Sequence, residues 1–250
     1  MIDSQRRFGC LMYHNIADEP HNPYSIPKET FRKQLNSLVA EGYILEGFSG
    51  LKARLSSDIW PERYCVISFD DGHRTFLDAA EILAAIGIRA SFFLTRDFCR
   101  KRSDFLKDGE IRQLASMGEL GTHGVTHSAL TTLSPQAAQE ELVTSKTWLE
   151  QCTGNPVTDM SAPGGFWNIR LQQMALRAGY DMVGTSREWW NKPSAIGKSR
   201  TVCRTAVRAQ FPAGLFASIS KCDSVFYLRR DLRSKLLYWP KQILIRARAS

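Results

Sequence analysis

Short apolar runs alternate along the 250-residue chain with longer segments in which apolar residues recur every three or four positions. The first pattern is typical of buried strands, and the second is typical of amphipathic helices. The runs predict strands at residues 10–13, 64–69, 90–94, 119–122, 157–160, 182–183 and 202–207. The segments between them predict helices at residues 28–41, 74–86, 108–117, 134–151 and 169–178. This alternation predicts right-handed crossovers and a parallel sheet, either open or closed into a barrel.

The ends of the predicted helices carry local signals. Ser134 precedes Pro135, so a good N-cap residue is followed by the residue preferred at the first helical position. Glycines follow five of the predicted helices, at positions 42, 87, 118, 154 and 179. Because sites in such folds lie at the carboxyl ends of the strands, the residues that follow each strand are the first candidates for function.

The composition fits a globular protein. A hydrophobic content of 43% in 250 residues is enough to bury one large core, and we expect one domain. No apolar run reaches the roughly 18 residues of a membrane span, and charged residues interrupt the N-terminal segment where a signal peptide would be apolar. Six cysteines without a CxxC pair predict reduced thiols. We therefore expect a cytoplasmic protein.

The positive charge is concentrated at one end of the chain. Residues 227–250 hold seven basic side chains and one acidic one, and so carry +6 of the net charge of +8. We predict a domain at residues 1–226 and a basic amphipathic C-terminal tail at residues 227–250. The tail could lie on an anionic membrane surface, or it could pack on the domain as a last helix with its arginines reaching water. Basicity confined to one end does not predict nucleic-acid binding.

Two adjacent carboxylates, Asp70 and Asp71, follow the apolar run at residues 64–69. Successive side chains of a strand point to opposite faces, so both can enter one site only if the chain turns at once, which Gly72 permits. Asp-Gly is also a common turn dipeptide. Two like charges beside a buried strand disfavour joint ionisation unless a cation compensates them, which favours a metal site here.

Two histidines, His123 and His127, follow the strand predicted at residues 119–122. The residues between them are poor helix formers, so we expect a tight turn that still brings the imidazoles together. Zinc accepts two imidazole nitrogens and a carboxylate oxygen and keeps a position open for water. The combination of this pair with Asp70 and Asp71 therefore predicts a catalytic metal site.

Five segments resemble motifs of the polysaccharide deacetylases, the NodB-homology or carbohydrate esterase family 4 enzymes. FDDG at residues 69–72 and HGVTH at 123–127 resemble the first two motifs of the family. LMYHNI at 11–16 resembles an LxYHxI opening, ASFFL at 90–94 resembles an A-T-F-F strand, and SAPGGFWN at 161–168 is similar to RxPxGxxN. The resemblance implies a distorted (β/α)7 barrel and removal of acetyl groups from N-acetylated sugars.

The resemblance also implies roles for individual residues. Asp71, His123 and His127 would hold a divalent metal ion, for which we expect zinc, although cobalt, nickel or manganese could be accommodated. Asp70 would act as the general base, since the adjacent cation keeps it ionised. A backbone N–H near His73 would stabilise the oxyanion.

The sequence departs from the family pattern in two places. No histidine follows His127, so the usual C-terminal Leu-x-His acid is missing, and the resemblance to poly-N-acetylglucosamine deacetylases implies that His14 takes this role. Ser161 stands where the family has the arginine that orients the catalytic aspartate, and Arg200 or Arg204 could contact Asp70 instead. The residues of this third motif predicted to bind substrate are Pro163, Gly164, Phe166 and Trp167.

These features predict a metal-dependent hydrolase that removes N-acetyl groups from an amino-sugar polysaccharide or from its oligosaccharide or lipid-linked precursor. A lipid-linked precursor would suit a protein held at the inner membrane face by its tail. Two alternatives remain open. The substrate could carry an O-acetyl ester or an N-formyl group, or the chain could bind carbohydrate or a membrane surface without catalysis.

Overall fold

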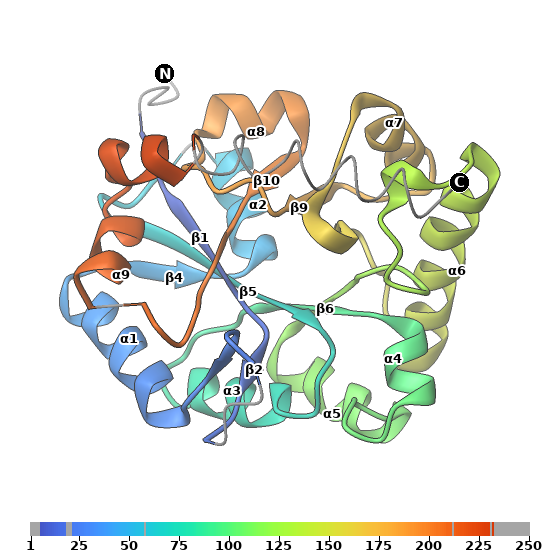
Figure 1. The fold of residues 1–250 in the computed structure, drawn as a ribbon, viewed down its shortest axis with the longest axis horizontal. Coiled ribbons are helices and arrows are strands. Elements are labelled where there is room, and N and C mark those ends of the chain that lie inside the picture. The colour runs from blue at the N-terminus through green and yellow to red at the C-terminus, as the bar shows by residue number, and fades with distance from the viewer. Residues whose placement is uncertain (1–5, 19–21, 58, 212, 231, 233–250) are drawn as a thin grey trace.

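A parallel sheet forms the centre of the molecule in the computed structural model, which describes residues 6–18, 22–57, 59–211, 213–230 and 232. Its strands are β1 (Gly9–Tyr13), β4 (Ile44–Glu46), β5 (Tyr64–Asp71), β6 (Ser91–Leu94), β7 (Glu119–Thr122), β8 (Asp159–Ser161), β9 (Met182–Thr185), β10 (Thr201–Cys203) and β11 (Thr205–Ala206). The order across the sheet is β10-β9-β8-β7-β6-β5-β1-β11, with β4 paired to the start of β5. Figure 1 shows the strands in the centre with helices around them.

The two ends of this order are one continuous segment, because β10 and β11 are separated only by Arg204. Val202 pairs with Gly184 of β9, and Thr205 pairs with Leu11 of β1. The segment thus leaves one edge of the sheet and joins the other, which makes the sheet a nearly closed barrel. This confirms the predicted distorted (β/α)7 barrel.

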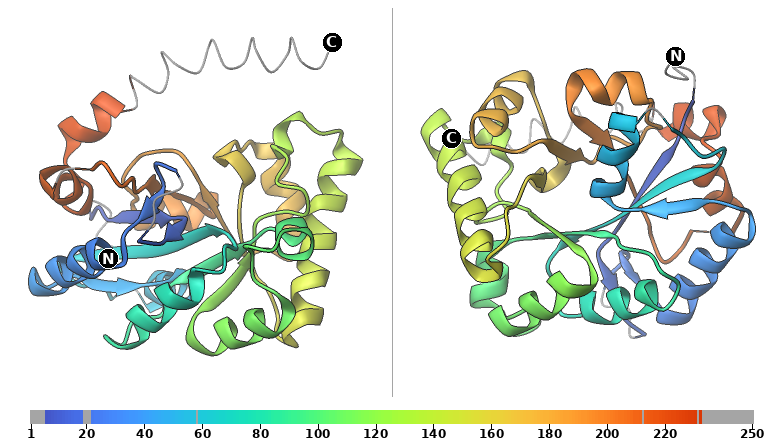
Figure 2. Two further views of the ribbon diagram at one scale, coloured as in Figure 1. Left: turned by 60° about the horizontal axis from the view of Figure 1, so that its bottom comes forward. Right: turned by 180° about the vertical axis from the view of Figure 1, so that it is seen from behind.

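Helices cover the outside of the barrel, as Figure 2 shows from two further sides. Each of the five predicted helices is present, with ends shifted by at most a few residues, and Ser134 Oγ accepts a hydrogen bond from the Ala137 N–H as an N-cap. No helix of the described residues is long and apolar enough to cross a membrane. The predicted helices are α1 (Lys28–Ala40), α3 (Phe76–Ala84), α5 (Asp108–Met117), α6 (Pro135–Thr153) and α7 (Ile169–Arg177); those not predicted are α2 (Phe48–Ser57), α4 (Arg96–Lys101), α8 (Pro193–Ser199) and α9 (Ala213–Ser220).

Two short strands, β2 (Asn15–Ile16) and β3 (Ser25–Ile26), pair with each other outside the main sheet.

Gly118 does not adopt the left-handed conformation expected of a glycine after a helix. Its φ of −136° is extended, because the chain passes directly from α5 into β7.

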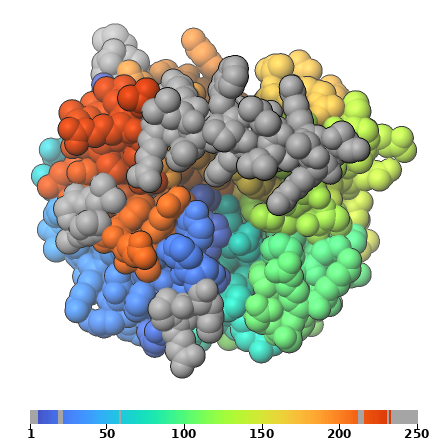
Figure 3. All heavy atoms as spheres, viewed as in Figure 1, coloured from blue at the N-terminus to red at the C-terminus, as the bar shows by residue number. Residues whose placement is uncertain are grey.

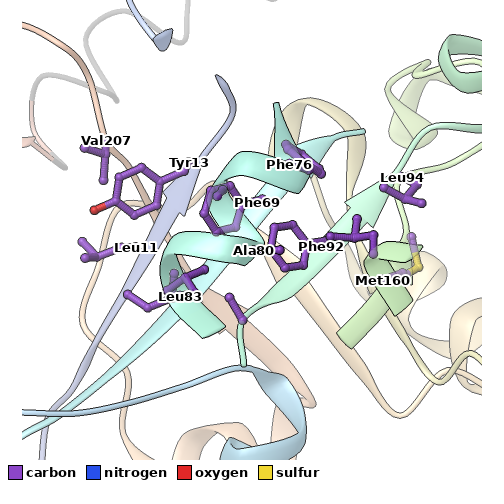
Figure 4. Close-up of a cluster of buried hydrophobic side chains, with 14 of the residues drawn as sticks. Leu11, Tyr13, Phe69, Phe76, Ala80, Leu83, Phe92, Leu94, Met160 and Val207 are labelled. Carbon is purple, nitrogen blue, oxygen red and sulfur yellow. The ribbon is translucent and has the colours of Figure 1, made fainter. Parts of the chain in front are cut away.

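Side chains of β5 alternate between two hydrophobic clusters. Ile67 and Phe69 belong to the cluster between the sheet and the helices, part of which is drawn in Figure 4. Val66 belongs to a second cluster inside the barrel, and Phe48 and Leu51 of α2 contribute to the same cluster. The period of two that places Val66 inside also places Asp70 inside.

The predicted tail begins with one buried residue. The Tyr227 side chain is fully buried, and its hydroxyl donates to the carbonyl of Ile219 over 3.3 Å. Leu228 and Leu232 are exposed. Residues 233–250 lie outside the described residues, so the amphipathic tail and its contact with a membrane stay predictions.

Candidate active site

Asp70 and Asp71 lie at the carboxyl end of β5, and the backbone turns between them. Asp70 keeps the alternation of the strand and is buried inside the barrel. Asp71 has a φ of +91°, a conformation that residues other than glycine rarely adopt. The turn expected at Gly72 thus starts one residue earlier, and a strained backbone places both carboxylates in one site.

The structure brings together the three side chains predicted to bind metal. Asp71 Oδ1 lies 3.4 Å from His123 Nε2 and 3.3 Å from His127 Nε2, and all three possible ligand atoms lie within 4.8 Å of one another. Asp71 Oδ1 is buried and has no hydrogen-bond partner among the described residues. An unsatisfied buried carboxylate oxygen facing two imidazole nitrogens fits a divalent cation, and the two-histidine, one-carboxylate donor set fits zinc.

The site histidines differ in their surroundings. Burial lowers the pKa of His123. At His127 burial acts in the same direction, but the Asp71 carboxylate outweighs it and raises the pKa. His123 Nδ1 lies 2.9 Å from the carbonyl oxygen of Ser161, to which it donates, and this leaves Nε2 directed at Asp71.

The loop that carries the histidines is held by a buried carboxylate that sequence reasoning missed. Glu141 of α6 accepts hydrogen bonds from the N–H groups of Val125, over 2.6 Å, and Thr126, over 3.2 Å, and from the Thr126 hydroxyl. These bonds replace the helical hydrogen bonds that this segment lacks. His127 has a φ of +66°, a second strained position among the three candidate ligands.

Asp70 is paired with Arg204, not with Arg200. The Arg204 guanidinium donates to both carboxylate oxygens over 2.7 Å, and Ser161 Oγ donates to Asp70 Oδ2 over 2.9 Å. Burial by itself would raise the pKa of Asp70, but the Arg204 guanidinium outweighs it and holds the pKa below the usual range. Arg204 therefore makes the ion pair that Ser161 cannot make, whereas Arg200 ends α8 at the surface.

Gly184 makes room for Arg204. A Cβ atom at position 184 would lie 2.7 Å from Arg204 Nε, so a larger residue on β9 would displace the guanidinium. Arg204 Nε donates to the carbonyl of Thr185 over 3.1 Å, and the side chain is fully buried. The closing segment of the barrel thus delivers a fixed cation to the interior.

His14 follows β1 and is close enough to the carboxylates of Asp70 and Asp71 to interact with both electrostatically. His14 Nδ1 is buried without a hydrogen-bond partner among the described residues, and the ring lies 4.9 Å from the Tyr24 ring, centroid to centroid. A partnerless imidazole nitrogen near the carboxylates is suited to moving a proton.

The other predicted site residues surround this centre. Pro163 is buried, and a Cβ atom at Gly124 would lie 3.2 Å from Pro163 Cγ, so the third motif packs on the histidine loop. Gly164 is exposed, and Phe166 and Trp167 are half-buried. The Trp167 indole donates to Gln172 over 2.8 Å and packs on the core. Next to the site, His73 Nδ1 lies 3.0 Å from Thr75 Oγ1.

The structure is a nearly closed parallel α/β barrel. Two histidines and an aspartate converge at its strand ends and form a candidate metal centre. A family model described as polysaccharide deacetylase matches residues 59–183, half of the chain. The chain belongs to the polysaccharide deacetylase family.

Two curated relatives agree with this assignment. The polysaccharide deacetylase family protein YxkH of Bacillus subtilis (strain 168) is 29% identical over 183 residues, covering 72% of this chain and 64% of its own. A chitooligosaccharide deacetylase of Bradyrhizobium sp. (strain ANU 289) is 25% identical over 138 residues, covering 53% of this chain and 61% of its own. The chain thus spans less than two thirds of the length of either relative.

Solved structures share the fold. The Streptococcus pyogenes deacetylase PplD aligns with a TM-score of 0.74 at 21% identity, covering 82% of this chain and 94% of its own. IcaB from Ammonifex degensii aligns with a TM-score of 0.74 at 20% identity, covering 87% of this chain and 97% of its own. At these identities the likeness supports the barrel fold.

Proposed function

We propose that this protein is a metal-dependent hydrolase that removes N-acetyl groups from an amino-sugar polysaccharide or from its oligosaccharide or lipid-linked precursor. The observation that carries the proposal is the convergence of Asp71, His123 and His127 beside a second carboxylate, Asp70, that is held ionised. The chitooligosaccharide deacetylase among the relatives supports an amino-sugar substrate.

The residues of the site divide the work of the reaction. A divalent ion held by Asp71, His123 and His127 would supply Lewis acidity and lower the pKa of a bound water. Asp70 Oδ2 lies 4.0 Å from His123 Nε2, so the carboxylate stands beside the metal ligands, where it accepts the proton of the attacking water.

Arg204 has two opposing effects on this base. The ion pair keeps Asp70 ionised and fixes its two oxygens, but it also makes the carboxylate a weaker base. The fixed position favours proton transfer from a water held nearby, and this gain offsets the lower basicity.

The departing amine receives a proton from His14, and a backbone N–H near His73 stabilises the oxyanion that forms on the amide carbonyl. Pro163, Gly164, Phe166 and Trp167 form the adjoining wall against which the sugar binds. His14 suits its role because its Nδ1 is not held by another side chain of the described residues.

The test compares two isosteric variants, Asp70→Asn and Asp71→Asn. We expect Asp71→Asn to lose zinc, since it removes a ligand charge, and Asp70→Asn to keep zinc while acetate release falls about 1,000-fold. Acetate release from N-acetylated and O-acetylated oligosaccharides, formate release from N-formylated ones, and zinc content are measured side by side, and His14→Gln is included as the acid variant. Equal zinc loss in both aspartate variants, or acetate release that survives Asp70→Asn, would contradict the proposal.

A further inference from the structure

Two exposed arginines stand beside the site, each stacked on an aromatic ring that contacts a site histidine. The Arg102 guanidinium lies 3.8 Å from the Phe98 ring centroid, and the Phe98 ring stacks on His127 with centroids 5.2 Å apart. In the second stack, Arg208 lies 5.3 Å from the centroid of the Tyr24 ring, which lies 4.9 Å from the ring of His14. The structure therefore presents two positioned cations near the candidate reaction centre.

The first stack is the more tightly built. Arg102 also lies 5.5 Å from the ring centroid of Phe105, so two phenyl rings flank one guanidinium. Phe98 already carries Arg102 directly over its ring and His127 against it, which leaves little of its surface for a sugar to stack on. The ring thus acts as a support that fixes the guanidinium, and less side-chain entropy is lost when Arg102 binds a ligand.

The charges of both arginines are uncompensated within the described part of the chain. No Asp or Glu side chain of the described residues forms an ion pair with Arg102 or Arg208 within 4.0 Å. The acids closest to Arg102 along the chain have other partners: Asp97 pairs with Arg96 and Lys101, and Asp104 faces His73 over 3.9 Å. An exposed, oriented guanidinium is matched by a carboxylate or a phosphate, to which it can donate two hydrogen bonds.

The two stacks reach the same face of the molecule. Figure 3 shows the orange segment that follows β11 against the blue segment of β2 and β3, and the green segment that includes α4 on the same face. The Ala209 N–H donates to the carbonyl of Pro23 over 2.9 Å, which ties the loop of Arg208 to the loop of Tyr24. A single aromatic ring separates each arginine from a site histidine. An anion bound by either arginine would therefore belong to a sugar unit next to the one that reacts.

We propose that Arg102 and Arg208 bind anionic groups on the sugar units that flank the acylated amino sugar, so that the preferred substrate is an acidic glycan. The anion is a uronic acid carboxylate or a phosphodiester, which share the geometry that a guanidinium recognises. This inference rests on the proposed function, since it names the substrate class of the same site.

The experiment measures binding and turnover separately with three probes: a neutral hexamer of N-acetylglucosamine, a hexasaccharide alternating N-acetylglucosamine with glucuronic acid, and a short oligomer of N-acetylglucosamine 1-phosphate. Binding is measured by calorimetry on the full-length Asp70→Asn protein, which holds substrate without turnover, and acetate release is measured on the wild type. We expect tighter binding of an acidic probe than of the neutral one, and a preference that weakens as salt is raised. The two acidic probes separate carboxylate from phosphodiester.

The effect of each arginine variant is expressed as the ratio of its affinity for the acidic probe to its affinity for the neutral probe. Arg102→Gln and Arg208→Gln should each lower this ratio about fivefold, as expected for one charge-assisted contact near the surface. A loss that comes from disturbing Phe98 or His127 affects both probes and cancels in the ratio. Arg102→Lys keeps the charge without the planar fork and should lower the ratio less.

Arg100→Gln is the matched control, because Arg100 is exposed in the last turn of α4, two residues before Arg102, and has no aromatic contact with the described residues. It should leave the ratio unchanged. Equal binding of acidic and neutral probes, or a ratio that survives Arg102→Gln and Arg208→Gln, would overturn the inference. A clear acidic preference without acetate release would instead overturn the proposed reaction and leave the inference standing.

Discussion

The barrel buries two aspartates, Asp70 at the carboxyl end of β5 and Asp159 at the start of β8, and their pKa values are shifted in opposite directions. At the carboxyl end, Asp70 accepts two hydrogen bonds of 2.7 Å from Arg204, and its pKa lies below the usual range. At the other end, Asp159 lies 2.8 Å from Lys52 Nζ, yet burial raises its pKa to about 6. A single cation next to a buried carboxylate therefore does not by itself keep the pKa of the acid low.

Two physical differences separate the ends. Arg204 is fully buried and donates to both oxygens of Asp70, so its charge acts on Asp70 with little screening by solvent. Lys52 is one-quarter exposed and also lies 3.9 Å from Asp181, and the charges of Asp181 and Glu119 both raise the pKa of Asp159. The end of the barrel around Asp70, here called the mouth, thus keeps a negative charge down to low pH. The end around Asp159, here called the floor, takes up a proton as the pH falls through about 6.

Removing the mouth cation should have the largest effect on stability. Arg204→Met leaves Asp70 buried without its partner, which costs about 3–5 kcal/mol in free energy of unfolding. Urea unfolding measures the loss, and Arg200→Met is the control, because Arg200 is exposed and its replacement should cost less than about 0.5 kcal/mol. Equal losses in the two variants would show that the ion pair does not set the charge of the mouth.

A second change sharpens the same test. Ser161→Arg in the Arg204→Met background moves the cation to the position where the motif of the family has its arginine. We expect part of the lost stability and acetate release to return, since a guanidinium from the end of β8 would again face Asp70. No recovery at all would show that the close fit beside Gly184 is required.

The sequence predicts the barrel well where side-chain periodicity is local. The seven predicted strands and five predicted helices are all found near their expected positions, because each strand carries a short apolar run and each helix a clear period of 3.6 residues. Helix α2 has no such signal, since its sequence FSGLKARLSS contains a glycine and three serines. It forms because Phe48 and Leu51 bury their side chains in the barrel interior and because Ser91 Oγ and Glu119 Oε2 accept its first N–H groups. These partners are distant in sequence.

Within the site, the four ionisable residues of the two main motifs are visible in the sequence, but the residues that support them are not. Arg200 and Arg204 could not be distinguished, because which of them reaches Asp70 depends on where the closing segment changes partner strand. Glu141 carries one signal that was missed. It shares the buried face of α6 with Ala138, Leu142 and Ser145, where an acid needs a specific partner.

The raised pKa of Asp159 predicts a pH-dependent stability of the floor. Between the unfolded value of 3.8 and the folded value of about 6, the folded state binds the extra proton, so stability from this group is full below pH 3.8 and is lost as the pH rises through 6. Asp159→Asn removes the titration. Its unfolding free energy relative to wild type should therefore rise by about 2 kcal/mol between pH 4 and pH 7. Urea unfolding across this range measures the difference, and a constant difference would contradict the proton-accepting floor.

Glu141 is a third buried carboxylate, and its partners are backbone N–H groups in place of a cation. Glu141→Gln keeps the shape but places an NH2 group against the donors of Val125 and Thr126, so the histidine loop should loosen. We expect zinc affinity, measured by competition with a chelator, to fall about 10–100-fold. The neighbouring exposed residue gives the matched control, Glu140→Gln, which should bind zinc as the wild type does. Equal affinities would show that the loop does not depend on this carboxylate.

The smallest predicted effects come from the hydroxyls at the two ends. Ser161 Oγ accepts from Arg204 over 2.6 Å and donates to Asp70, and all three side chains are buried. Ser161→Ala should therefore cost about 1–2 kcal/mol in free energy of unfolding. Thr158 Oγ1 accepts from Lys52 over 2.9 Å in a half-buried place where water can take over, so the isosteric Thr158→Val should cost less than about 0.5 kcal/mol. If the two variants lose the same stability, the mouth is no more preorganised than the floor, and the opposite pKa shifts of Asp70 and Asp159 must come from the charged neighbours alone, because burial raises the pKa of both.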